Sequence, residues 1–128
     1  MIFGVGTDIA KVSRFEKWVL NQKMIERFFN PCEISEFSGR NLKHLCEHYA
    51  ARFAAKEALS KALGTGFSGL ELKDFGITND ENGKPEFHFG QKTKEYIGRI
   101  PGKNWKAHIS LSHEKDFAIA FSVIEAEM

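Results

Sequence analysis

The stretch Ala50–Gly66, A-A-R-F-A-A-K-E-A-L-S-K-A-L-G-T-G, has the composition of a helix that ends at a glycine. It is rich in alanine and leucine, it contains no proline, and its first glycine is Gly64, where a helix commonly stops. A stripe of small apolar side chains recurs at helical spacing, formed by Ala51, Ala55, Ala58, Leu59 and Ala62. We therefore expect a long helix, beginning near Asn41, that packs closely against a neighbouring element.

Two charged residues of this helix, Glu57 and Lys61, lie four positions apart on the opposite side, which also carries Phe53. A helix that is apolar on two sides is expected to be covered on two sides. Charges in such a setting need a partner or a ligand, because burying them uncompensated costs free energy. An ordinary surface ion pair is the alternative. The nearby Lys56 and the glycines from Gly64 onward favour a site for a metal ion and phosphate.

The composition is that of an ordinary globular protein, with 128 residues, 42% hydrophobic content and a formal net charge of +1. We expect one domain over residues 1–128. The charge gives no case for nucleic acid, and no apolar run is long enough to span a membrane. The first residues lack the features of a signal peptide, and Cys32 and Cys46 are expected as reduced thiols, so we predict a cytoplasmic location.

The hydrophobic patterns predict helices mainly in the first half and hairpins in the second half of the chain. Strands are expected at residues 2–9, 70–78, 86–89, 106–112 and 117–124, and helices at 11–20, from Asn30-Pro31 to about Phe37, from about Asn41 to Gly64, and at 91–100. The order predicts an α+β fold in which a long central helix packs on a mainly antiparallel sheet.

The first predicted strand contains Gly4 and Gly6 and ends near Asp8. Glycine within a strand often marks the close approach of a backbone or a ligand. Asp8 suits either a cap for the next helix or a functional carboxylate, and this segment alone leaves both readings open.

Basic residues outnumber acidic ones between Lys11 and Arg27. The basic residues are Lys11, Arg14, Lys17, Lys23 and Arg27, and the acidic ones are Glu16 and Glu26. This excess suits an acidic partner, while a solvated basic helix face is the alternative.

Two further patterns are weak. His44, Cys46 and His48 are close in sequence, but a structural zinc site normally has four ligands at recognisable spacing. The glycine-rich residues 64–69 follow a helix, whereas a P-loop precedes one.

Four motifs together resemble the holo-acyl-carrier-protein synthase family, the small class of 4'-phosphopantetheinyl transferases. They are G-V-G-T-D-I at 4–9, R-F-A-A-K-E-A-L-S-K-A-L-G-T-G at 52–66, N-G-K-P at 82–85 and H-I-S-L-S-H at 108–113. Their order and spacing match the family over essentially the whole chain. The resemblance implies the 4'-phosphopantetheinyl transferase fold, and transfer of phosphopantetheine from coenzyme A to a serine of apo-acyl carrier protein for fatty acid biosynthesis. It also implies a homotrimer with active sites at the subunit interfaces.

The same resemblance implies roles for individual residues. It assigns Mg²⁺ to Asp8 and Glu57; catalysis to Glu57 and Lys61; coenzyme binding to Lys56, Lys61, Gly64, Asn82, Gly83, Lys84, Pro85 and His113; and carrier-protein docking to Arg14, with Lys17, Lys23 and Arg27 added by charge alone. Mg²⁺ prefers one or two carboxylates with phosphate oxygens and water, which agrees with two acidic ligands. Some relatives have an acidic residue at the position of Ser35, so the general base is either Glu57 or a metal-ordered water.

Other functions remain compatible with these residues. A metal-dependent phosphohydrolase acting on a nucleotide or coenzyme pyrophosphate would also use two carboxylates, a histidine and lysines. A nucleotide-binding trimer without catalytic activity is a second alternative. The broad-range transferase class resembles two such domains in one chain, which the length of 128 residues disfavours.

Overall fold

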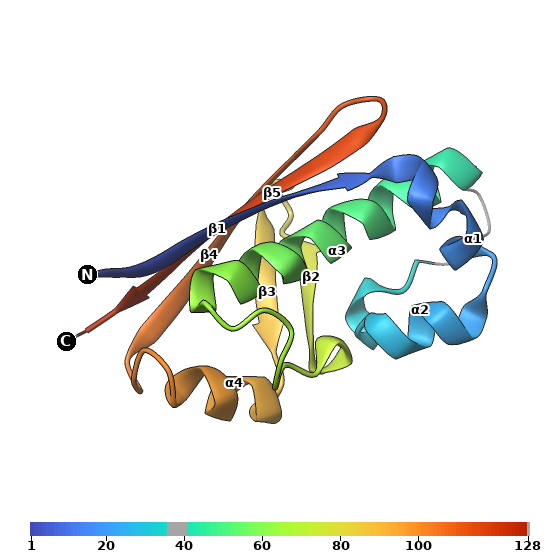
Figure 1. The fold of residues 1–128 in the computed structure, drawn as a ribbon. Coiled ribbons are helices and arrows are strands. Elements are labelled where there is room, and N and C mark those ends of the chain that lie inside the picture. The colour runs from blue at the N-terminus through green and yellow to red at the C-terminus, as the bar shows by residue number, and fades with distance from the viewer. Residues whose placement is uncertain (36–40, 128) are drawn as a thin grey trace.

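The computed structural model describes residues 1–35 and 41–127. It is an α+β structure in which one long helix packs against a three-stranded antiparallel sheet, with a two-stranded hairpin beside it (Figure 1). In chain order, the elements are β1 (Ile2–Lys11), η1 (Val12–Phe15), α1 (Glu16–Val19), α2 (Gln22–Phe28), η2 (Pro31–Glu33), α3 (Leu42–Leu63), η3 (Leu72–Asp74), β2 (Phe75–Asn79), β3 (Pro85–Phe89), α4 (Gln91–Gly98), β4 (Trp105–His113) and β5 (Phe117–Ala126).

The larger sheet has the strand order β1-β5-β4, so the first and last strands of the chain are hydrogen-bonded neighbours. Asp8 pairs with Ala120, which in turn pairs with Leu111 across the sheet. Alternate residues of β5, including Ala118 and Ala120, are buried toward α3. Because paired residues share a face, Asp8 on one edge strand and Leu111 on the other point to the same side as α3.

Helix α3 begins and ends where the sequence indicates. The side chain of Asn41 accepts a hydrogen bond from His44 N at 2.8 Å, which caps the first turn. Gly64 ends the helix in the left-handed conformation with φ of 82°. The expected boundaries of the long helix are therefore confirmed.

The small residues of α3 allow β1 to approach closely. A Cβ atom on Gly4 or Gly6 would lie 2.0 Å from the carbonyl oxygen of Ala62 or Ala58, respectively. No side chain fits at such a distance, so the glycines of β1 and the alanines of α3 are required together. The close approach places Asp8, two residues after Gly6, directly beside the helix.

The opposite side of α3 is covered as well, as the sequence predicts. Phe53 and Ala54 are buried, and Phe75 and Ile77 of β2 are fully buried with them. Beside this layer, β2 and β3 form the expected hairpin. The carboxylate of Asp80 accepts hydrogen bonds from the N–H groups of its turn, and Gly83 adopts φ of 84°.

Three predicted boundaries are wrong. The expected helix over residues 11–20 is instead the end of β1 followed by the short helices η1 and α1, and α2 is a separate helix that the pattern did not predict. The strand expected from Leu70 begins only at Phe75, after the turn η3. The helix predicted from Asn30 to about Phe37 is reduced to η2, because Ile34 is extended, and Phe37 itself lies outside the described residues.

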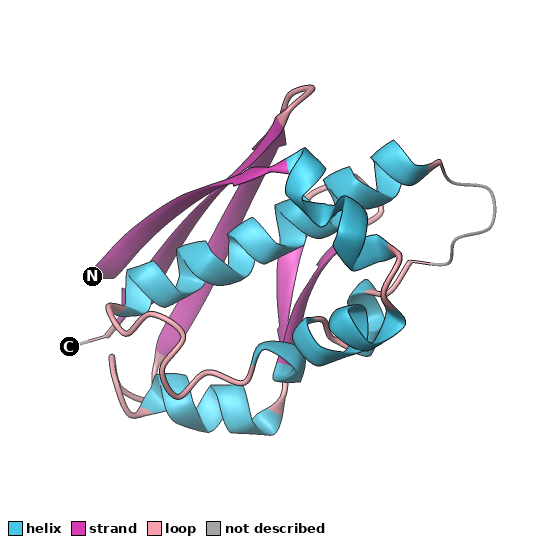
Figure 2. Ribbon diagram, turned by 45° about the vertical axis from the view of Figure 1, so that its right-hand side comes forward, coloured by secondary structure: helices cyan, strands magenta, loops and turns pink. Residues whose placement is uncertain are grey.

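The face of the large sheet that points away from α3 is apolar and exposed. Figure 2 shows the described helices on one side of this sheet, with the other side open. The exposed apolar side chains of β1 and β5 are Ile2, Phe3, Val5, Ile9, Phe117, Ile119 and Phe121. We call this set the outer sheet face. Exposed apolar surfaces of this kind are typical of sites that bind another protein, a membrane or a ligand.

Candidate active site

Asp8 and Lys61 meet at the contact between β1 and α3. The Nζ atom of Lys61 lies 3.1 Å from Asp8 Oδ1 and donates a second hydrogen bond to Thr7 O at 3.0 Å. The Asp8 side chain is 18% exposed, whereas that of Lys61 is 50% exposed. The mostly buried Asp8 carboxylate is therefore paired with an ammonium group that is still accessible to a ligand.

Glu57 lies one helical turn before Lys61 and belongs to the same group of charges. We call Asp8, Glu57 and Lys61 the Asp8 group. Burial and, secondly, the negative charge of Asp8 raise the pKa of the Glu57 carboxyl. The positive charges of Lys61 and Arg14 act in the opposite direction. The two carboxylates repel each other, and a cation bound beside both would relieve that repulsion.

The donor set fits Mg²⁺. Two carboxylates from Asp8 and Glu57, with positions left for phosphate oxygens and water, are what this ion usually takes from a protein. Within the described residues, no group of three or more His, Cys, Asp or Glu side chains could hold a metal ion. His44, Cys46 and His48 do not converge: Cys46 is buried in the core, and a ring nitrogen of His48 contacts Glu33 O at 2.6 Å.

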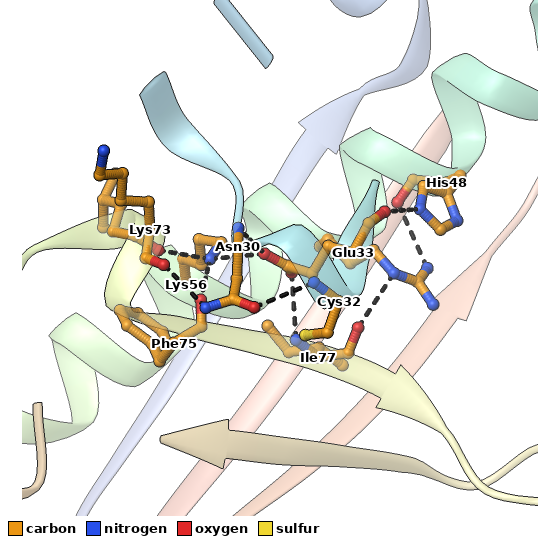
Figure 3. Close-up of polar contacts among 10 residues, drawn as sticks. Asn30, Cys32, Glu33, His48, Lys56, Lys73, Phe75 and Ile77 are labelled. Carbon is orange, nitrogen blue, oxygen red and sulfur yellow. Dashed lines mark hydrogen bonds and ion pairs between the residues drawn. The ribbon is translucent and has the colours of Figure 1, made fainter. Parts of the chain in front are cut away.

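Lys56 does not take the position that the resemblance implies. Its side chain is fully buried, and its ammonium lies 2.8 Å from Glu33 Oε1. It donates further hydrogen bonds to Leu72 O at 2.6 Å and Phe75 O at 2.5 Å (Figure 3). All three donors of the ammonium are used inside the protein. In this structure the residue joins α3 to η2 and β2, and binding of coenzyme phosphate by Lys56 stays a prediction that would require one of these contacts to break.

The buried pair sits in a continuous polar network. Glu33 Oε2 accepts a hydrogen bond from Ile77 N, and Glu33 Oε1 accepts one from Asn30 N as part of a capping box (Figure 3). Arg52 Nε donates to Ile77 O at 3.2 Å. Burial lowers the pKa of Lys56, and the neighbouring Glu33 charge opposes that shift.

Three of the other expected coenzyme residues, Gly83, Pro85 and His113, form a second group, which Gly64, Asn82 and Lys84 do not line. His113 is the last residue of β4, and its Nδ1 lies 3.7 Å from Glu47 Oε2 of α3. A hollow of about 550 Å³ brings His113 together with Asn79, Gly83 and Pro85 of the hairpin. This second group is called the hairpin pocket below.

The hairpin pocket and the Asp8 group lie at opposite edge strands of the large sheet and along different stretches of α3. Asp8 is on edge strand β1 and His113 on edge strand β4, both facing the helix that runs between them. Their contacts on the helix, Lys61 and Glu47, are separated by roughly 21 Å along its axis at about 1.5 Å per residue. Within one chain the structure does not bring the two groups together.

The four basic residues expected to bind a partner are all exposed, on η1, α1 and α2. Arg14 lies above an aromatic cluster, 5.4 Å from the ring of Phe53 and 5.7 Å from that of Trp18. Arg27 lies 5.2 Å from the ring of Phe28, while Lys17 and Lys23 project from α1 and α2. Arg14 connects this basic surface to the Asp8 group, because its charge acts on Glu57.

Sequence reasoning missed three residues near these groups. Glu47 and Arg52 line the hairpin pocket, and Glu33 neutralises Lys56. Arg52 begins the motif at 52–66 without a role assigned to it, and the Asn30-x-x-Glu33 spacing predicts a helix cap but not a buried partner for a lysine.

Comparisons with known proteins agree with this architecture. A sequence model of the 4'-phosphopantetheinyl transferase superfamily matches residues 4–122. The chain therefore belongs to this superfamily, which confirms the resemblance that its motifs indicate. A holo-[acyl-carrier-protein] synthase of Treponema denticola is 46% identical over 125 residues, covering 98% of this chain and 99% of the relative.

Two solved structures are similar over their whole length. The holo-(acyl-carrier-protein) synthase of Bacillus anthracis, in complex with CoA (3',5'-ADP), has a TM-score of 0.80 and 36% identity and covers 99% of each chain. The holo-ACP-synthase of Plasmodium yoelii has a TM-score of 0.83 and 34% identity, covering 100% of this chain and 98% of that one. These matches confirm the predicted fold class.

Proposed function

We propose that this chain, as a single domain over residues 1–128, transfers the 4'-phosphopantetheine group from coenzyme A to a serine of apo-acyl carrier protein for fatty acid biosynthesis. The products are holo-acyl carrier protein and adenosine 3',5'-bisphosphate. The observation that carries the proposal is the contact of Lys61 with Asp8 beside Glu57, in a chain similar over its full length to holo-acyl-carrier-protein synthases.

The chemistry requires a serine oxygen to attack the β-phosphorus of the coenzyme diphosphate, with the bond to the adenosine bisphosphate oxygen breaking. Such a transfer depends mainly on positioning and on neutralising the phosphate charge. Mg²⁺ held by Asp8 and Glu57 would supply part of that neutralisation. Lys61 supplies a fixed positive charge from an accessible ammonium. Glu57 is our candidate to accept the serine proton, directly or through water, since burial raises the pKa of its carboxyl.

We further propose that coenzyme A binds between two copies of the chain in a homotrimer. The Asp8 group and the hairpin pocket lie at opposite edge strands and along different stretches of α3, so one coenzyme molecule can contact both if they come from neighbouring subunits. The exposed outer sheet face supports assembly, because it offers aromatic and branched side chains for burial. Gly64 and residues 82–85 would then lie along the coenzyme.

The acidic carrier protein would dock on the basic surface of η1, α1 and α2. Arg14, Lys17, Lys23 and Arg27 are exposed there, and Arg14 adjoins Glu57. Complementary charge accelerates encounter and fixes orientation more than it adds affinity. Docking at this surface brings the acceptor serine toward the Asp8 group.

The reaction is proposed for the cytoplasm, where both cysteines can stay as the free thiols they are in this structure. No helix among the described residues is long and apolar enough to cross a membrane. A metal-dependent phosphohydrolase is not supported, because the relatives named above are carrier-protein synthases.

The test is intact-mass spectrometry of apo-acyl carrier protein incubated with this protein, coenzyme A and Mg²⁺. We expect a mass gain of one phosphopantetheine group, abolished without metal and by Asp8→Ala. Breakdown of coenzyme A with an unchanged carrier protein would indicate hydrolysis instead.

A further inference from the structure

The loop of residues 64–70 follows Lys61 and has a shape that glycines impose. Gly64, Gly66 and Gly69 have φ of 82°, 61° and 83°, in the region that favours glycine. A Cβ atom on Gly64 or Gly66 would meet no atom within 4 Å. This part of the loop therefore borders open space close to the exposed ammonium of Lys61.

The same loop presents unused hydrogen-bond donors. The N–H groups of residues 66–69 donate to no backbone carbonyl within the described part of the chain. Successive N–H groups around left-handed glycines form concavities that suit anions. These donors, five to eight residues after Lys61 in the chain, are candidates to meet a phosphate that the ammonium attracts.

Tyr96 of α4 contacts this loop at Ser68 and Gly69. The Tyr96 hydroxyl donates a hydrogen bond to Ser68 O at 2.5 Å. Its ring packs against Gly69 so closely that a Cβ atom there would lie 2.4 Å from Tyr96 Cε2. Among the side-chain hydrogen bonds of the described residues, this is the one that reaches the loop from another element.

We propose that Tyr96 is a positioning residue for coenzyme binding: its hydroxyl fixes the 64–70 loop so that the loop N–H groups can meet the coenzyme phosphates. The proposal rests on the transferase function proposed above. Tyr96 touches neither substrate. It acts through the Ser68 carbonyl, and its role differs from that of Lys61, which carries charge.

Tyr96→Phe isolates the hydroxyl, because the ring that packs on Gly69 is kept. We expect the Kd for coenzyme A, measured by calorimetry, and the KM for coenzyme A to rise about three- to tenfold, the effect of losing one hydrogen bond. The KM for carrier protein and the melting temperature should stay close to wild type. Lys92→Met is the matched control on the same helix: it removes an exposed contact of 3.1 Å with Glu71, next to the loop, and keeps the Tyr96–Ser68 hydrogen bond.

The outcomes separate the two levels of inference. If wild type modifies the carrier protein and Tyr96→Phe binds coenzyme A as tightly as Lys92→Met does, the positioning role is wrong while the transferase function stands. If Tyr96→Phe raises the KM for coenzyme A and the KM for carrier protein equally and also lowers the melting temperature, Tyr96 has only a structural role and the proposal is overturned. If wild type transfers nothing, both proposals fail.

Discussion

The Lys56 ammonium lies 2.8 Å from Glu33 Oε1, and neither side chain is exposed to solvent. Lys56 directly precedes Glu57, so a buried ion pair is adjacent in sequence to a proposed metal ligand. Because the pair ties α3 to η2 and β2, it fixes how the helix is rotated about its axis. This rotation decides whether Glu57 and Lys61 face Asp8.

Removing one partner of this pair should strongly destabilise the fold. Lys56→Met leaves the Glu33 charge buried without its cation, and we expect the free energy of unfolding to fall by about 3–5 kcal/mol. The double variant Glu33→Gln/Lys56→Met should recover much of that loss, because no uncompensated charge remains. Urea denaturation of the single and double variants measures both effects.

An exposed pair provides the comparison. Lys92→Met removes the contact between Lys92 and Glu71, which should change the unfolding free energy by less than about 1 kcal/mol. If Lys56→Met costs no more than this control, Lys56 does not hold the elements together as we infer.

Glu57→Gln should stabilise the metal-free protein while abolishing activity. Burial and the Asp8 charge raise the folded-state pKa of Glu57, so its charged form is disfavoured by folding. The stability of wild type relative to the variant should therefore be greatest below the unfolded-state pKa of glutamate and should decline as pH rises through the folded-state pKa. Urea denaturation at pH 4 and pH 7 without divalent cations tests the sign, and we expect turnover to fall about 100-fold or more.

The response to Mg²⁺ tests whether Glu57 is a metal ligand or whether Glu57→Gln acts only through stability. Added Mg²⁺ should raise the melting temperature of wild type, because an ion bound only by the folded state stabilises it, and should do so much less for Glu57→Gln. Equal shifts in both proteins would exclude Glu57 as a metal ligand.

The long helix and the Asp8 group are predictable because each rests on a local signal. The alanine stripe of α3 and the glycines of β1 are two halves of one close contact, and each is visible in the sequence alone. Once both elements are placed, Asp8, Glu57 and Lys61 come together with little further information. Gly64 is equally local, since its position requires only a left-handed backbone.

The position of Lys56 could not be predicted, because burial of a charge depends on a partner distant in sequence. Glu33 lies 23 positions before Lys56 in the chain, and its sequence context indicates only a helix cap. The break of the expected helix over residues 11–20 has a similar origin. Val12 and Phe15 have helical spacing, but β1 continues to Lys11 because β5 extends far enough to pair with it.

Charge reversal on the basic surface should weaken carrier-protein use selectively. The double variant Lys17→Glu/Lys23→Glu places two negative charges where an acidic partner would dock, and we expect the KM for carrier protein to rise roughly tenfold. The KM for coenzyme A should not change, and the difference from wild type should narrow as salt is added. Steady-state kinetics at two ionic strengths provides the measurement.

Lys94→Glu on α4 is the matched control, since it reverses one exposed charge away from this surface. If Lys94→Glu raises the KM for carrier protein as much as the double variant does, the effect is one of net charge and not of a docking surface.

Two inactive variants should restore activity to each other if the active site is shared between subunits. Asp8→Ala disables one group and His113→Ala the other, on opposite edge strands of the large sheet. In randomly mixed closed rings, about a quarter of the interfaces join an intact Asp8 group to an intact hairpin pocket. Mixing the variants at equal concentration and allowing subunit exchange should therefore recover roughly a quarter of wild-type turnover.

Phe121→Lys tests the assembly on which this recovery depends. The substitution places a charge in the centre strand of the outer sheet face, where Phe121 is 46% exposed in the single chain. Light scattering should then report monomers, and mixtures of Asp8→Ala and His113→Ala proteins that also carry Phe121→Lys should recover no activity. Full activity of Phe121→Lys monomers that keep both Asp8 and His113, or no recovery by the unmodified mixture despite subunit exchange, would place both groups in the service of a single chain and contradict an interfacial site.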